Sequence, residues 1–365
     1  MKIVSIVGTR PNFIKLAALV EELKKHRKME HVLIHTGQHY DFLMSKLFFE
    51  QLGLPKPDEH LVCQTGVGAD EQKKFLKAAI KEALKRQKPD LVIVVGDVNS
   101  TVAGAGAAKE LGIRVAHVEA GLRSFDKSMP EEINRVQTDK ISDFLFTTEE
   151  SANKNLLNEG ISKDKIFFVG NVMIDTLLSH KEKAKKSKIL SELRLKKKDY
   201  AVVTLHRPSN VDSKESLSYV LDILENLQEN IKIVFPIHPR TLKNLENFNL
   251  LKKVKSQKNL TMTKPLGYLD FLNLMSNSKF VLTDSGGIQE ETTAWGVPCI
   301  TMRDNTERPV TVEQGTNLLV STNKDKIIAI CKGLIKKSDV KGKMPKFWDG
   351  KAAQRIVKIL IKNFS

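Results

Sequence analysis

The sequence is poor in cysteine and in aromatic residues. Its 365 residues include three cysteines, at positions 63, 299 and 331, and 6% aromatic residues. The cysteines are odd in number, widely spaced and without a CxxC pair. This spacing excludes a disulfide framework and favours reduced thiols in a cytoplasmic protein. No apolar run is long enough to span a bilayer, and residues 1–8 resemble a short strand ending at a glycine rather than a signal peptide.

Acidic residues are fewer than basic ones. The 43 Asp and Glu residues stand against 59 Lys and Arg, which gives a net charge of +16. Such a balance fits either a nucleic-acid binder or a basic enzyme with an anionic substrate. The densest basic stretch, residues 181–198, mixes Glu and Leu at helical spacing and has no interleaved aromatic residues. We therefore interpret it as a solvated helix face and linker, and expect no nucleic-acid partner and no membrane partner.

Signatures of metal and dinucleotide sites are also missing. The GxG pairs at 66–68 and 104–106 neither follow a predicted strand nor continue to GxxG. His35 and His39 are four residues apart, but they flank a predicted strand end, and the sequence has no HExxH motif. We expect neither a metal nor another cofactor.

Short β-branched runs alternate with amphipathic helical stretches, and this alternation appears twice. Predicted strands occupy residues 3–7, 32–36, 91–95 and 115–118, and then 201–205, 232–236, 280–283 and 299–301. Predicted helices between them include 11–25, 70–87, 99–111, 215–228 and 286–295. The pattern predicts two doubly wound, Rossmann-like α/β domains with parallel sheets and a cleft between them. We place them at 1–180, completed by a last helix at 350–365, and at 181–349.

Polar and charged residues follow the predicted strands of the first half. Arg10 and Lys15 follow the first strand and can contact phosphate. Asp97 and Glu119 each follow a later strand, and Glu131 lies in the first turn of a helix that begins at residue 130. Taken alone, each acid has an ordinary structural explanation as a helix-capping or first-turn carboxylate. Three acids at one sheet edge instead favour proton-transfer chemistry.

The second half contains the strongest single motif. Ser285, Gly286 and Gly287 join a strand to a helix, where backbone N–H groups and the helix N-terminus favour a diphosphate. Glu291, further along that helix, can accept hydrogen bonds from ribose hydroxyls, and Arg308 offers a further phosphate contact. His206 and His238 follow strands and are candidate acids or bases, although each alone is more often structural.

Ten motifs, in this order, carry a specific resemblance to a known family. They are GTRPNFIK, TGQHYD, VGDVNST, HVEAGLRS, PEEINR, GNVMIDTL, HRPSN, PIHPR, DSGGIQEE and MRDNTERP. Together they closely resemble the non-hydrolysing UDP-N-acetylglucosamine 2-epimerase family over nearly the whole chain. The resemblance implies a GT-B architecture, a cytoplasmic homodimer and a role in polysaccharide biosynthesis. It also implies interconversion of UDP-GlcNAc and UDP-ManNAc through elimination of UDP to 2-acetamidoglucal and re-addition.

The resemblance also implies roles for individual residues. It makes Asp97, Glu119, Glu131 and His206 the catalytic residues, with His206 near the leaving diphosphate. It assigns substrate binding to nine residues: Arg10, Lys15, Leu266, Phe271, Ser285, Gly286, Gly287, Glu291 and Arg308. Of these, Leu266 and Phe271 match the uracil contacts. Gln38, His39 and His238 match a second, activating UDP-GlcNAc site found in bacterial members.

Several alternatives remain open at this point. A hydrolysing epimerase, which releases ManNAc and UDP, shares many of the motifs, although the absence of an appended kinase-like domain favours the reversible type. An epimerase acting on a 2,3-diacetamido uronic sugar nucleotide would keep the same uridine and diphosphate contacts. A GT-B glycosyltransferase would need an acceptor pocket and fewer carboxylates. An RNA-binding protein would rest on the positive charge alone.

Overall fold

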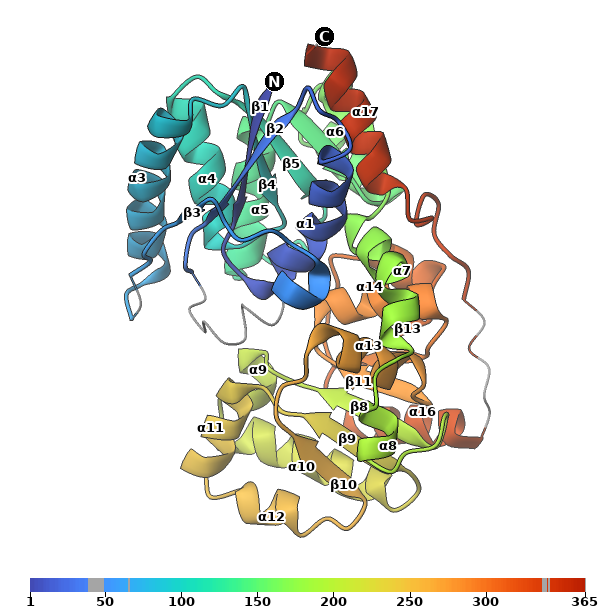
Figure 1. The fold of residues 1–365 in the computed structure, drawn as a ribbon. Helices are drawn as coiled ribbons and strands as arrows, with labels where there is room; N and C mark the ends of the chain where they lie inside the picture. The colour runs from blue at the N-terminus through green and yellow to red at the C-terminus, as the bar shows by residue number, and fades with distance from the viewer. Residues whose placement is uncertain (39–48, 65, 337–339, 341, 365) are drawn as a thin grey trace. The chain divides into compact units, whose positions relative to one another are not determined.

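The computed structural model describes residues 1–38, 49–64, 66–336, 340 and 342–364 (Figure 1). The chain forms two compact units. The first comprises Met1–Ser179 together with Lys346–Ser365, and the second comprises His180–Pro345. Among the described residues, no helix is both long enough and apolar enough to cross a bilayer.

The first unit is built on a seven-stranded parallel sheet in the order β3-β2-β1-β4-β5-β6-β7. Its strands are β1 (Lys2–Val7), β2 (Glu30–His35), β3 (Glu59–His60), β4 (Leu91–Val95), β5 (Arg114–Ala120), β6 (Phe144–Thr147) and β7 (Ile166–Phe168). The central strand β4, with the sequence LVIVV, is buried along its whole length. Such a continuous apolar run is typical of a parallel strand covered on both faces.

Helices flank this sheet. They are α1 (Arg10–Leu23), α3 (Ala69–Gln87), α4 (Asn99–Glu110), α5 (Pro130–Ile141), α6 (Glu150–Asn158), the 3-10 turn Lys163–Lys165, α7 (Val172–Ala184), which runs into the second unit, and α17 (Ala352–Phe364). Helices α3 and α4 lie side by side, as Figure 1 shows. Helix α17 packs on α1, so the last helix of the chain covers the first helix.

The second unit contains a six-stranded parallel sheet in the order β10-β9-β8-β11-β12-β13. Its strands are β8 (Tyr200–Thr204), β9 (Lys232–Pro236), β10 (Leu260–Thr263), β11 (Phe280–Thr283), β12 (Cys299–Thr301) and β13 (Asn317–Leu319). Its helices are α8 (Ile189–Glu192), α9 (Pro208–Val211), α10 (Lys214–Gln228), α11 (Pro239–Asn247), α12 (Leu251–Lys255), α13 (Tyr268–Ser276), α14 (Gly286–Trp295), α15 (Pro309–Glu313) and α16 (Lys324–Lys336). The two parallel sheets with flanking helices confirm the predicted fold class.

Both sheets contain a point at which the strand order reverses direction. In the first unit this point lies between β1 and β4, and in the second between β8 and β11. Ligands of doubly wound sheets bind beside such points, at the carboxyl ends of the strands. The segments that follow β1, β4, β8 and β11 are therefore the places to look for a site in each unit.

Candidate functional site

The loop after β1 brings a lysine to the carboxyl edge of the first sheet. Thr9 caps α1, and the Asn12 side chain donates a hydrogen bond to the Val95 carbonyl at the end of β4 (2.9 Å). Lys15 follows on the same helix. Its ammonium lies 2.6 Å from the Glu119 carboxylate, and Lys15 and Glu119 are only 5% and 1% exposed. A buried pair of opposite charges therefore joins the start of α1 to the end of β5.

Backbone geometry explains how Lys15 and Glu119 meet. Glu119 has a φ of 74°, and the pairing of β5 with β6 shifts register between Val118 and Ala120. This left-handed conformation is unusual for a residue with a side chain and is found mostly where function or packing demands it. Gly96 lies against the same lysine, because a Cβ there would come within 2.8 Å of the Lys15 Nζ atom. Lys15 thus fits between the turns that follow β4 and β5.

A second group of charges surrounds the turn after β4. Asp97 forms an ion pair with Arg135 of α5. Arg135, 1% exposed, also lies 2.9 Å from the carboxylate of Glu132. Glu132 in turn accepts hydrogen bonds from the backbone N–H groups of Ser124 (2.9 Å) and Phe125 (3.2 Å). These contacts fix the loop after β5 and the start of α5 beside Asp97.

Two other predicted residues of this unit lie at the same edge. Glu131 is half-buried and makes none of these contacts, which belong to its neighbour Glu132. Arg10 is the first residue of α1 and is half-buried. The structure therefore places Lys15 and Glu119 in one ion pair and Asp97 in another at the same sheet edge. Arg10 and Glu131 lie on α1 and α5, the helices that supply the two cations.

A wholly buried histidine lies directly behind these ion pairs. The His117 ring nitrogens lie 2.6 Å from an oxygen of Asp139 and 2.8 Å from the Gly96 carbonyl oxygen. Asp139 also accepts a hydrogen bond from the Gly121 N–H (3.1 Å) and forms an ion pair with Arg123 (2.7 Å). Burial alone would raise the pKa of Asp139, but the charges and hydrogen bonds of His117 and Arg123 outweigh it and lower that pKa.

In the second unit, Asp284 organises the switch point between β8 and β11. Its carboxylate is fully buried and accepts hydrogen bonds from the backbone N–H groups of His206 (3.0 Å) and Arg207 (2.9 Å) and from the Asn210 amide (3.1 Å). The His206 Nδ1 atom lies 2.9 Å from it. Burial opposes ionisation, yet the His206 contact and these donors lower the pKa of Asp284. The His206 ring, held at one nitrogen, is 41% exposed at its side chain.

The helix that follows β11 presents the predicted diphosphate motif. Ser285 is the N-cap of α14, and Gly286 and Gly287 form its first turn. A Cβ at Gly286 would lie 2.5 Å from the Arg308 guanidinium, so the helix and that cation approach closely. Arg308 is held by Glu290 (2.9 Å) and Glu307 (2.5 Å). The unit thus supplies backbone N–H donors and an oriented guanidinium at one strand end, which suits an anion.

Glu291 lies deeper in the same helix. Burial and the charge of Glu290 raise its pKa to about 8, and a hydrogen bond with the Tyr268 hydroxyl offsets only part of this effect. Tyr268 begins α13, and the half-buried Leu266 and Phe271 flank that helix start. The predicted nucleoside contacts therefore lie on α13 and α14, which pack together, and in the segment just before α13 that contains Leu266.

The predicted activator residues that the structure describes belong to different units. The Gln38 side-chain oxygen accepts hydrogen bonds from the backbone N–H (2.9 Å) and hydroxyl (2.6 Å) of Ser100, near the turn after β4. His39 lies outside the described residues. His238 belongs to the second unit, where it caps α11 and its ring centre lies 5.4 Å from that of His206.

Three residues that hold these sites together have no role predicted from the sequence: Arg135, Asp284 and Asn210. They lie inside the motifs PEEINR, DSGGIQEE and HRPSN, respectively. For Asp284 the sequence does offer a signal, because this residue directly follows a predicted strand, much as Asp97 does. Arg135 required the phase of α5, which places it one turn after Glu132.

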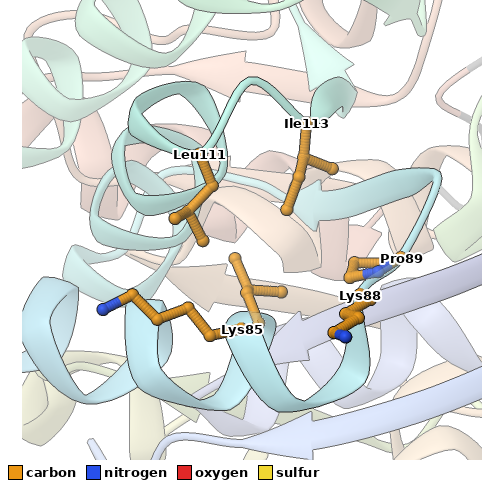
Figure 2. Close-up of a pocket in the computed structure, with 6 residues that line it drawn as sticks. Lys85, Lys88, Pro89, Leu111 and Ile113 are labelled. Carbon is orange, nitrogen blue, oxygen red and sulfur yellow. The ribbon is translucent and has the colours of Figure 1, made fainter.

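A shallow hollow elsewhere in the first unit lacks such groups. Figure 2 shows Lys85, Lys88, Pro89, Leu111 and Ile113 around it. Pro89 precedes β4 and Ile113 precedes β5, so the hollow lies at the amino ends of these strands. This is the edge of the sheet opposite to Asp97 and Glu119. Its lining consists of apolar side chains and two exposed lysines, Lys85 and Lys88, and includes no carboxylate or histidine. We therefore do not assign the functional site to this hollow.

Comparisons with known proteins identify the family of the chain. The model of a family described as UDP-N-acetylglucosamine 2-epimerase matches residues 21–361. A UDP-N-acetylglucosamine 2-epimerase of Methanocaldococcus jannaschii is 48% identical over 368 residues, covering 99% of both chains. A UDP-2,3-diacetamido-2,3-dideoxy-D-glucuronate 2-epimerase of Pseudomonas aeruginosa is 39% identical, covering 99% of this chain and 100% of its own.

A solved structure is similar along the entire chain. The crystal structure of the Methanocaldococcus jannaschii UDP-GlcNAc 2-epimerase in complex with UDP-GlcNAc and UDP has a TM-score of 0.93 and 47% identity. The match covers 99% of this chain and 100% of the other. This likeness confirms the predicted GT-B architecture.

Proposed function

Because the chain belongs to the UDP-N-acetylglucosamine 2-epimerase family, we propose that it interconverts UDP-GlcNAc and UDP-ManNAc by reversible inversion at carbon 2. One observation carries the proposal beyond the family name. Two ion pairs, Lys15 with Glu119 and Arg135 with Asp97, lie where β1, β4 and β5 end, beside the switch point of the first sheet. A dense set of buried carboxylates and cations is what proton transfer beside an anionic substrate requires.

The reaction that suits these groups is an elimination followed by an addition. The hydrogen on carbon 2 is not acidic enough for simple deprotonation. Instead, a base removes this proton while the bond from carbon 1 to the UDP oxygen breaks, and the C–H electrons form the double bond of 2-acetamidoglucal. UDP then adds back to carbon 1, and an acid returns a proton to the opposite face of carbon 2. The atoms balance with no cofactor.

We assign the proton transfers to the carboxylates of the first unit. Asp97, Glu119 and Glu131 are the candidate bases and acids. Lys15 orients Glu119 through their 2.6 Å contact, and Arg135 orients Asp97. Glu119 and Asp97 are thus held by different cations, which suits removal of a proton on one side of carbon 2 and its return on the other.

We assign the grip on UDP mainly to the second unit. The first turn of α14, from Ser285 to Gly287, and the guanidinium of Arg308 bind the diphosphate, together with Arg10 of the first unit. Asp284 holds the Nδ1 atom of His206, so the Nε2 atom of the ring is left to donate a proton to the departing phosphate oxygen. Glu291 receives the ribose hydroxyls, and Leu266 and Phe271 contact the uracil.

The assembly and setting follow from the same family relationship. We propose a cytoplasmic homodimer that serves polysaccharide biosynthesis. Gln38, His39 and His238 are the candidates for binding an activating second molecule of UDP-GlcNAc. Native mass spectrometry with and without UDP-GlcNAc tests both the dimer and a second equivalent of ligand.

Proton NMR in deuterated water tests the reaction. With UDP-GlcNAc, the proposal predicts UDP-ManNAc carrying deuterium at carbon 2, with no lasting free UDP. Accumulation of free ManNAc and UDP would instead identify a hydrolysing enzyme. An unchanged spectrum despite UDP binding would contradict the proposal, and the same assay with a UDP-2,3-diacetamido uronic sugar would then test the alternative substrate.

Asp97→Asn tests the assignment of the base or acid. We expect the variant to lose deuterium incorporation while binding UDP as before, because the amide is isosteric but cannot exchange the proton. Asp90→Asn is the matched control, since Asp90 precedes β4 at the opposite edge and accepts a hydrogen bond from the Lys2 N–H (2.7 Å). If Asp97→Asn also lost UDP binding, the residue would be structural.

A further inference from the structure

The His117 ring has both of its nitrogens engaged by acceptors. One is the Gly96 carbonyl oxygen, at 2.8 Å, which has no hydrogen to donate. The other is the Asp139 carboxylate, at 2.6 Å. That carboxylate already accepts the Gly121 N–H and lies 2.7 Å from the Arg123 guanidinium, so it is held in its ionised form. Two acceptors require two N–H donors, and only an imidazolium ring provides both.

The charges around this ring are balanced by their neighbours, of which the outermost, Glu159, lies at the surface. His117, Arg123 and Asp139 are between 0% and 3% exposed. Glu159 completes the group by accepting two hydrogen bonds from Arg123, at 2.7 and 2.8 Å. An imidazolium and a guanidinium thus face two carboxylates. A buried charge is tolerated when it is paired and hydrogen-bonded in this way, and removing one partner leaves an uncompensated charge.

The same ion pair contacts the two turns that carry the proposed acids and bases. Through Nε2, His117 holds the carbonyl of Gly96, the residue directly before Asp97. Through its other oxygen, Asp139 holds the N–H of Gly121, two residues after Glu119. Glu119 itself has the left-handed φ of 74°, a conformation that needs support from its surroundings.

We propose that a doubly protonated His117, paired with Asp139, is the positioning element that fixes the turns of Asp97 and Glu119 relative to each other. His117 and Asp139 lie beneath these turns and do not touch the substrate. The inference rests on the proposed function for its catalytic consequence, but not for its structural content.

Kinetics of three variants test the consequence. His117→Gln keeps the ring's approximate size but cannot donate from both positions, so we expect kcat for deuterium exchange at carbon 2 to fall about 100-fold, as misplacement of a catalytic group by about 1 Å can cause. The dissociation constant of UDP should be unchanged, because the second unit supplies most of that binding. Since His117 and Asp139 act as a unit, His117→Gln/Asp139→Asn should lose no more kcat than the worse single variant.

His31→Gln is the matched control. His31 also lies in the first sheet, on β2, and its ring nitrogen lies 2.9 Å from the Ser5 hydroxyl. It is near the amino end of the strands, away from Asp97, and we expect its substitution to leave kcat unchanged. A folded His117→Gln enzyme with the kcat of the His31→Gln enzyme would overturn the proposal, and so would additive losses in the double variant.

A second measurement does not depend on activity or on the folding of a variant. In the wild-type protein labelled with 15N-histidine, NMR should show a proton on both ring nitrogens of His117 at neutral pH. A bare ring nitrogen would overturn the inference even if the enzyme were an active epimerase. If the wild type exchanged no deuterium, the proposed function would fail, while this spectrum would still decide the state of the ion pair.

Discussion

Glu291 lies 4% exposed beside Glu290, and both its burial and that neighbouring charge raise its pKa from 4.5 to about 8. A raised pKa means that the folded protein retains the proton after the unfolded chain has released it. The free energy of unfolding therefore falls as the pH rises from about 4.5 to about 8, and levels off above that window.

Replacing this carboxyl with an amide removes that pH dependence. We expect Glu291→Gln to gain stability relative to the wild type between pH 5 and pH 8, by about 2–4 kcal/mol. Chemical unfolding of both proteins at the two pH values measures the change in their difference, which cancels the other titrating groups. Parallel pH profiles would show that Glu291 is already ionised at pH 5.

The same carboxyl links UDP binding to proton release. If the ribose hydroxyls donate to Glu291, they favour its ionised form and lower its pKa, so UDP binding near pH 7 should release up to about one proton. Calorimetric titration in two buffers with different ionisation enthalpies measures this number. Glu291→Gln should abolish the release, and an unchanged release would exclude Glu291 as the ribose contact.

At the scale of an element, the first turn of α14 depends on the absence of a side chain. A Cβ at Gly286 would come within 2.5 Å of Arg308 and 2.8 Å of Glu307. Gly286→Ala should therefore displace the guanidinium and weaken UDP binding, by about 1.5–3 kcal/mol if the charge-assisted contact is lost. Calorimetry with UDP measures the loss.

Gly333→Ala in α16 is the control for this substitution. A Cβ at Gly333 meets nothing within 4 Å, and the helix gains from losing a glycine. We expect about 0.5–1 kcal/mol of added stability and unchanged UDP affinity. Equal UDP affinities for the two alanine variants would remove the α14 turn from the binding site.

Element by element, the sequence predicts the central strands well and the outer ones poorly. Strands β1, β2, β4 and β5, and β8, β9, β11 and β12, have apolar runs that identify them. Five strands of two to four residues escaped prediction: β3 (EH), β6 (FLFT), β7 (IFF), β10 (LTMT) and β13 (NLL). All but β6 are edge strands, paired on one side, so their place depends on a neighbour rather than on their own pattern.

Sites show the same division. Asp97, Glu119 and Ser285 could be found because they follow predicted strands closely. Whether Glu131 or Glu132 faces Arg135 depends on the rotation of α5 about its axis, which neither local spacing nor composition determines. The pairing of His117 with Asp139 joins residues 22 positions apart and needed the tertiary structure.

At the scale of the whole molecule, the last segment of the chain completes the first unit. Trp348 is 1% exposed, and its indole N–H donates to the Thr148 carbonyl (3.0 Å). Asp175 accepts a hydrogen bond from the Ala353 N–H (2.7 Å) at the start of α17. These contacts join residues that are 200 and 178 positions apart in the sequence.

Trp348→Ala should destabilise the first unit by about 3–5 kcal/mol, because it leaves a large cavity and an unpaired carbonyl. Urea unfolding, monitored by hydrogen exchange of the β4 amides, measures the loss of stability in the first unit itself. Lys358→Ala, on the exposed face of α17, should stay within about 0.5 kcal/mol of the wild type. Equal losses for both variants would mean that α17 is only loosely attached.

The return of α17 to α1 also bears on the order of events at the ribosome. The whole of the second unit emerges before α17 does, so His180–Pro345 can fold during synthesis while the apolar face of α1 still lacks its cover. For that interval the nascent first unit exposes a surface on which chaperones bind and neighbouring chains aggregate. If translation stalled just after Pro345, the second unit would be complete, while the first unit, although synthesised earlier, would still lack α17.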